Sequence, residues 1–207
     1  MNKTSGKKIL STVLTAIIVL SAFSAMCTPA SAATEEEIEQ AIVNGTAWLA
    51  AQQNPDGSWP GDWGWNSVAT TGFAVLKLEM YAKELGYDPF DPEYEYSNNV
   101  VAGLNYIFAN AHNINISVQP AGDPDTNGNG IGVGIWANHP TYETGIAMMA
   151  IAESAHLEKV VNVPGSPVDG RTYGEVLQDA VDYLAFGQND ADNPQGGWGY
   201  DANFVCV

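Results

Sequence analysis

The sequence predicts an all-α fold in which two kinds of helix alternate, the arrangement of an α/α toroid. Two observations carry this prediction. Three segments have one apolar stripe at helical spacing, and between them lie two segments that are apolar on almost every side. Thr71-Gly72 in the first apolar segment recurs as Thr144-Gly145 in the second, 73 residues later. Self-similarity at such a coarse period indicates a repeat architecture.

The first 32 residues have the order of parts found in a secretory signal peptide. Three lysines precede an apolar run from Ile9 to Met26, and the small-residue triplet Ala30-Ser31-Ala32 follows. We therefore expect residues 1–32 to be removed on export. Residues 33–207 are then a secreted or cell-surface domain that keeps no membrane span after cleavage.

The first striped helix begins where Thr34 and Glu37 have the spacing of a capping box. Its stripe comprises Ile38, Ala41, Ile42, Gly45, Trp48, Leu49 and Gln52, and the turn sequence Asn54-Pro55-Asp56-Gly57 ends it. The segment from Ser67 to Tyr81 leaves little polar face, which is typical of a buried helix.

The same pair of elements then returns. Residues 100–109 carry a stripe like that of the first helix, and residues 141–155 are again apolar nearly all round. A third striped helix begins at a second capping box, Thr172 to Glu175, and continues to Leu184. The sequence thus predicts five main helices, with the apolar ones in an inner layer and the striped ones outside. The striped helices align when Trp48, Tyr106 and Tyr183 are superposed.

Two of the striped helices end in the same way, with Gln near the helix end and Gly-x-Trp or Gly-Gly-Trp after a turn. The residues of this structural repeat motif are Gln52, Gln53, Gly57, Trp59, Gln188, Gly197 and Trp198. The motif resembles the QW repeat of the prenyltransferase/squalene oxidase repeat family, which includes terpenoid cyclases and protein prenyltransferases. In such a motif the Gln amide can donate and accept at a neighbouring helix terminus, and the Trp ring covers that contact.

The resemblance implies a closed ring of about a dozen helices. Five helices cannot close such a ring, so we expect an incomplete ring and expect residues 33–207 to be part of a longer repeat domain. The middle unit also lacks the Gln and the Gly-Trp ending, and a polar insertion at 123–130 stands in their place.

Catalysis stays open, because the sequence holds no complete catalytic motif of the family. The acidic DxDD motif of the cyclases has its nearest match in Asp123-Pro124-Asp125-Thr126, which lacks the final Asp pair. A zinc set of Asp, Cys and His is not formed by Asp201 and Cys206, which have the wrong spacing. Glu143 lies in the first turn of a predicted inner helix and is a candidate for the mouth of a central cavity, although a partner for the helix dipole is the simpler interpretation.

The polar insertion is a candidate calcium site, and calcium is the one cofactor that the sequence indicates. Oxygen-bearing side chains occupy alternate positions, at Asp123, Asp125, Asn127 and Asn129. The positions where an EF-hand has Ile and a bidentate Glu are Gly130 and Gly134, so a full EF-hand is excluded. A looser calcium loop and a plain Asx-turn loop remain the two interpretations.

The charge limits the class of partner. Three of the seven Lys and Arg precede residue 33, which leaves four against 24 Asp and Glu and a net charge of −20. Such a surface repels nucleic acid and anionic lipid. We therefore predict a non-catalytic module for an unknown extracellular protein or glycan. Its candidate contact residues are Trp59, Trp63, Trp65, Trp136 and Trp198.

The competing hypothesis is a fragment of a terpene cyclase/prenyltransferase-like or polysaccharide-degrading enzyme whose catalytic residues lie beyond residue 207. A shielded carboxylate in a cavity lined by aromatic side chains would favour the enzyme. Exposed Trp side chains on one rim would favour binding.

Overall fold

The computed structural model describes residues 32–61, 67–190 and 196–202. The predicted signal peptide up to Ser31, together with Trp63, Trp65 and Cys206, lies outside these residues. The chain divides into two compact units, one ending at Ile42 and the other beginning at Val43.

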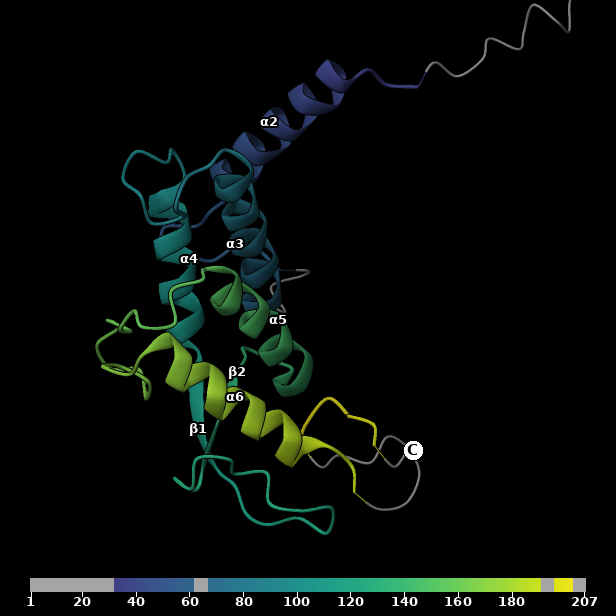
Figure 1. The fold of residues 1–207 in the computed structure, drawn as a ribbon, viewed down its shortest axis with the longest axis vertical. Coiled ribbons are helices and arrows are strands. Elements are labelled where there is room, and N and C mark those ends of the chain that lie inside the picture. Colours follow the sequence, from purple (N-terminus) through teal and green to yellow (C-terminus); the bar gives the residue numbers. More distant parts are fainter. Residues whose placement is uncertain (1–31, 62–66, 191–195, 203–207) are drawn as a thin grey trace, which may run out of the picture. The chain divides into compact units, whose positions relative to one another are not determined.

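Helix α2, Glu35–Ala51 (Figure 1), begins in the first unit. Its start has the predicted capping box. The Thr34 amide donates to the Glu37 carboxylate at 2.8 Å, and the Glu37 amide donates to the Thr34 hydroxyl at 3.2 Å. These two bonds lower the pKa of Glu37 and fix the start of the helix.

The second unit contains the remaining four predicted helices (Figure 1). They are α3, Ser67–Glu84; α4, Ser97–Ala109; α5, Pro140–Glu153; and α6, Tyr173–Gly187. The mostly helical prediction is therefore confirmed for the described part of the chain. In that part, no helix is both long and apolar enough to cross a membrane.

A two-stranded antiparallel sheet interrupts the helices and corrects the all-α prediction. Strand β1, Ala111–Asn115, pairs with β2, Ile131–Ile135, so that Ala111 lies opposite Ile135. The polar residues of β1 and the glycines of β2 concealed the strands, because both patterns are typical of loops. Those glycines are needed for close packing, since a Cβ built on Gly132 would lie 2.9 Å from the Cα of Tyr183 in α6.

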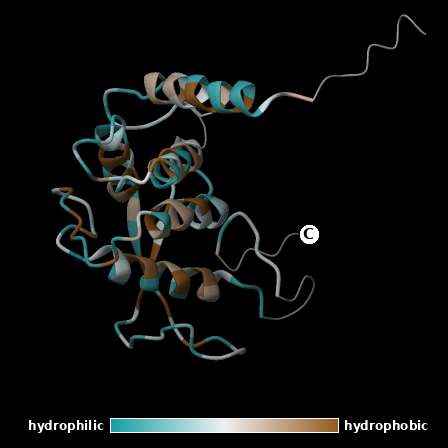
Figure 2. Cartoon of the chain, turned by 45° about the horizontal axis from the view of Figure 1, so that its top comes forward, coloured by the Kyte–Doolittle hydropathy of each residue, from teal (hydrophilic) through white to brown (hydrophobic). Residues whose placement is uncertain are grey.

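The packing of the second unit places the two apolar helices next to each other. Helix α3 packs against α5 and α4, while α6 packs against α5 and covers β2 (Figure 1). In Figure 2 hydrophobic residues lie along the helices, and the more hydrophobic and more buried of the two strands is β2. The apolar helices are nevertheless not buried on every side, because Phe73 and Met80 of α3 and Met149 of α5 are about half exposed.

Candidate functional site

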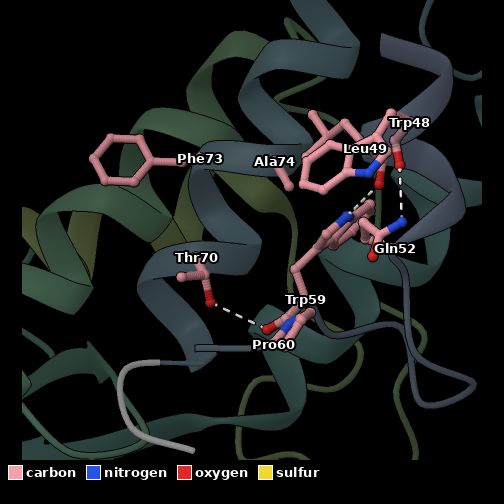
Figure 3. A pocket seen from close by; sticks show the side chains of 8 residues that line it. All are labelled: Trp48, Leu49, Gln52, Trp59, Pro60, Thr70, Phe73 and Ala74. Atoms are coloured by element: carbon pink, nitrogen blue, oxygen red, sulfur yellow. Dashed lines mark hydrogen bonds between the residues drawn. The ribbon is translucent and has the colours of Figure 1, made fainter. Parts of the chain in front are cut away.

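An apolar hollow of the second unit lies between the end of α2 and the first half of α3 (Figure 3). It has a volume of about 340 Å³. Trp48 and Phe73 flank it and are 65% and 53% exposed. Its lining is Trp48, Leu49, Gln52, Trp59, Pro60, Thr70, Phe73 and Ala74, and we call it the Trp48–Phe73 pocket.

Trp59 forms a fixed wall of this pocket. Its indole Nε1 donates to the Leu49 carbonyl of α2 at 2.7 Å, and its backbone amide donates to the Thr71 hydroxyl of α3 at 2.9 Å. The Thr70 hydroxyl donates to the Trp59 carbonyl at 3.1 Å (Figure 3). The side chain is 3% exposed, so these bonds hold the pocket's shape without a ligand.

The polar side chains of the lining are turned toward the protein itself. The Gln52 amide donates to the Trp48 carbonyl at 3.4 Å, and the Thr70 hydroxyl also contacts the Ser67 carbonyl at 3.2 Å. What remains open to a ligand is mainly aromatic and aliphatic surface. The pocket can therefore accept an apolar group and offers few directional contacts to a polar one.

The repeat motif at the end of α2 joins this helix to the start of α4. The Gln53 amide donates to the carbonyls of Gly57 and Asn99, each at 3.0 Å, and accepts from the Asn99 side chain at 2.7 Å. Asn99 also donates to the Ala50 carbonyl at 3.3 Å. Of the two glutamines proposed from the sequence, Gln53 makes the contact between helices, whereas Gln52 bonds only within its own helix in the described contacts.

The motif at the end of α6 repeats the same local hydrogen bonds. Gln188 donates to the Gly196 carbonyl at 2.9 Å, as Gln53 does to Gly57. The Trp198 indole donates to the Leu184 carbonyl at 2.8 Å, as Trp59 does to Leu49. Both acceptors lie four residues before their Gln. The described residues of the two motifs thus share these hydrogen bonds.

The glycine that turns the second motif is Gly196 and not the Gly197 proposed from the sequence. Gly196 has φ 78°, and its counterpart Gly57 has φ 89°. In this left-handed region an L side chain is strained. Gly197 instead corresponds to Ser58, because both carbonyls accept from the Asn that follows the Gln.

The candidate calcium loop has its oxygen atoms turned toward its own backbone. Asp125 accepts from the amides of Gly130 at 2.7 Å, Gly128 at 2.8 Å and Asn129 at 3.3 Å. These bonds, that of Gly130 first, lower the pKa of Asp125. Asp123 accepts from the Asp125 amide at 3.1 Å. The geometry is that of an Asx-turn loop.

Two buried carboxylates of α6, which the sequence analysis missed, anchor this loop. Asp179 accepts from the side-chain amides of Asn127 at 2.7 Å and Asn129 at 3.0 Å, and it pairs with Arg171 at 2.6 Å. Asp182 accepts from the Thr126 hydroxyl at 2.9 Å. The sequence could have pointed to these two residues, because both acids interrupt the apolar stripe of α6 and lie three residues apart, on one face of the helix.

Glu143 acts as a cap at the start of α5. It is fully buried, and its carboxylate accepts from the amides of Ala137 at 3.0 Å, Asn138 at 3.1 Å and His139 at 2.8 Å. A carboxylate at this end of a helix also interacts favourably with the helix dipole. Both oxygens are occupied by these amides, so the structure gives Glu143 a structural role and not a place at a cavity mouth.

Glu79 of α3 is a second buried acid that the sequence analysis missed. It is fully buried, and neither carboxylate oxygen has a hydrogen-bond partner among the described residues. Burial first, and then the charge of Glu153, raises its pKa to about 9, which Lys83 only partly offsets. Glu79 is therefore protonated at neutral pH. The sequence could have pointed to Glu79, because it is an acidic residue within the apolar pattern of α3.

The remaining described candidate, Trp136, is partly buried and lies between two other rings. Its ring stacks on His112 with centroids 4.1 Å apart and on Tyr183 at 5.9 Å. In the described residues, no group of three or more His, Cys, Asp or Glu is placed to hold a metal ion.

Comparison with protein-family models, with curated proteins and with solved structures finds no match to this chain.

Proposed function

We propose that this protein is an exported binding module whose Trp48–Phe73 pocket takes an apolar segment of an extracellular protein partner. The observation that carries the proposal is the exposure of Trp48 and Phe73 on either side of an almost wholly apolar pocket. Large aromatic side chains left in water are costly unless another surface covers them, and they are enriched at binding hot spots.

A protein partner fits the pocket better than a glycan. Sugars stack on aromatic rings, but their hydroxyls also need polar partners, and the polar side chains of this lining bond within the protein. The net charge of −20 on residues 33–207 favours a partner with an apolar contact point in a neutral or basic surrounding.

We further propose that the second unit is a segment of an α/α toroid with QW-type repeats. Two features support this architecture: the apolar helices α3 and α5 pack on each other, and the motifs of Gln53 and Gln188 have the same hydrogen bonds. The toroid does not determine the function, because function resides in sites that differ between proteins of one fold.

The enzyme hypothesis places the catalytic residues beyond residue 207, and among the described residues Glu79 is the acid that could support it. A carboxyl group protonated at neutral pH is what general acid catalysis needs. Glu79 is fully buried, however, and it is not part of the lining of the Trp48–Phe73 pocket. A substrate bound in that pocket would not contact it, so we place the binding function first.

Selection of peptides from a displayed random library tests the proposal. The library is enriched on the wild-type protein and depleted on the double variant Trp48→Ser/Phe73→Ser. We expect peptides with two or three large apolar residues and a basic or neutral remainder. We also expect the affinity for these peptides to fall by about 30-fold or more in either single Ser variant.

Met149→Ser is the matched control, because Met149 is a half-exposed apolar residue of α5 outside the pocket. It should leave the affinity unchanged. Peptides that bind all variants equally, or binding to a glycan array that survives the double substitution, would remove the pocket from the function.

A further inference from the structure

The two repeat motifs share their local geometry but differ in what covers them. A Cβ built on Gly57 would lie 2.2 Å from the Ala102 carbonyl oxygen of α4, whereas one built on Gly196 meets first the amide of its own Gln188, at 3.9 Å. Trp59 is 3% exposed and Trp198 is 47% exposed. The second motif therefore has the form of a docking surface that no described part of the chain covers.

The first motif shows what kind of surface fits. Trp59 packs on α4 at Gly103, where a Cβ would lie 3.1 Å from the ring. A helix that presents a glycine to the Trp ring allows the backbone to approach closely. The occupant of the second motif should therefore be a helix with a glycine at the same position.

The chain itself offers such a helix. When Trp48 is superposed on Tyr106, Gly45 of α2 falls on Gly103 of α4. Gly45 is exposed, and a Cβ built there would meet no neighbouring described atom within 4 Å. Gly45 thus has no Trp packed on it among the described residues. Trp198 contacts Gly187 of its own helix, where a Cβ would lie 4.0 Å from the ring, and no glycine of a second described helix lies against it.

We propose that copies of this protein associate head to tail, with Trp198 of one copy packed on α2 of the next copy at Gly45. The two contacting surfaces are different, so the contact is heterologous, and an open assembly of any length keeps one free surface of each kind at its ends. Like-charged copies repel one another, so association should strengthen as salt screens the net charge.

Analytical ultracentrifugation of the purified protein over a range of concentrations, at low and high salt, tests this proposal. We expect reversible association that grows with concentration and with salt. Trp198→Ala and Gly45→Leu should each weaken it by about 30-fold or more, as loss of a central interface contact does. Ala109→Leu adds the same side chain at another exposed helix position and should leave association unchanged.

Mixing the two variants gives the sharpest result. Trp198→Ala retains the α2 surface and Gly45→Leu retains the Trp198 motif, so an equimolar mixture should form dimers and nothing larger. A wild-type protein that stays monomeric at all concentrations would overturn the proposal. Self-association of the Gly45→Leu variant at the wild-type level would overturn it as well, because it would indicate a symmetric contact between two Trp198 motifs.

Discussion

At the scale of single residues, Glu79 couples folding to pH. Its folded pKa is about 9 against an ordinary value of 4.5, so the folded state holds a proton that the unfolded chain releases between these values. The contribution of Glu79 to stability is therefore greatest below about pH 4.5 and falls as pH rises toward 9. We expect Glu79→Gln to be more stable than wild type by about 2 kcal/mol or more at pH 8, with the difference shrinking toward pH 5.

Thermal unfolding of both proteins over this pH range measures the difference, and the other carboxylates cancel in it. Glu153→Gln serves as the control, because it removes a neighbouring charge and leaves the buried carboxyl in place. A difference that does not change with pH would show that Glu79 is charged in the folded state.

Ala155, just beyond α5, is strained in its backbone. Its φ is 59°, in the left-handed region where an L side chain costs about 1 kcal/mol. Ala155→Gly should therefore raise the free energy of unfolding by about 1 kcal/mol in urea denaturation. Ala152→Gly, three residues earlier and inside α5, should lower it by a similar amount, because Gly is a poor helix former. Equal effects of the two substitutions would contradict the assigned backbone.

At the scale of elements, apolar periodicity predicts the helices and fails for the strands. All five described helices lie where stripes, capping boxes and turns place them, because these signals are local. Strands β1 and β2 are stabilised by pairing with each other and by the cover of α6, which no local pattern records. The candidate site shows the same limit. The Gln and Trp motifs could be predicted from the sequence because they are local. The environments of Glu79, Asp179 and Phe73 could not, because they depend on packing between elements.

The repeat makes a prediction about two equivalent glycines. A Cβ on Gly103 of α4 would lie 2.3 Å from the Val75 side chain and 3.1 Å from the Trp59 ring. Gly103→Ala should therefore destabilise the protein by about 1 to 3 kcal/mol through overpacking. Gly45 of α2 has open space, so Gly45→Ala should stabilise it by up to about 1 kcal/mol through helix propensity.

Urea denaturation of both variants, at concentrations where the protein is monomeric, measures the change in the free energy of unfolding that each substitution causes. The two substitutions have opposite effects on stability only if Gly103 is packed against other residues and the equivalent Gly45 is not. Equal destabilisation would mean that Gly45 is packed, and the docking surface on α2 would be lost with it.

At the scale of the whole molecule, the excess of negative charge determines how the fold responds to ions. The protein carries 24 acidic residues, and self-repulsion of their charges opposes the folded state. Any salt should raise the unfolding temperature by screening. A bound calcium ion would add a specific effect to this general one.

We expect the loop at 123–130 to show no such specific effect. Asp125 already accepts three backbone amides, and Asp179 is paired with Arg171 and two Asn side chains, so a cation would have to displace these bonds. The unfolding temperature in calcium chloride should therefore equal that in magnesium or sodium chloride of the same ionic strength, and a chelator should not lower it. A rise in unfolding temperature that occurs only with calcium and is lost in Asp125→Asn would show that the loop binds calcium. The loop would then exchange its own amides for the ion on binding.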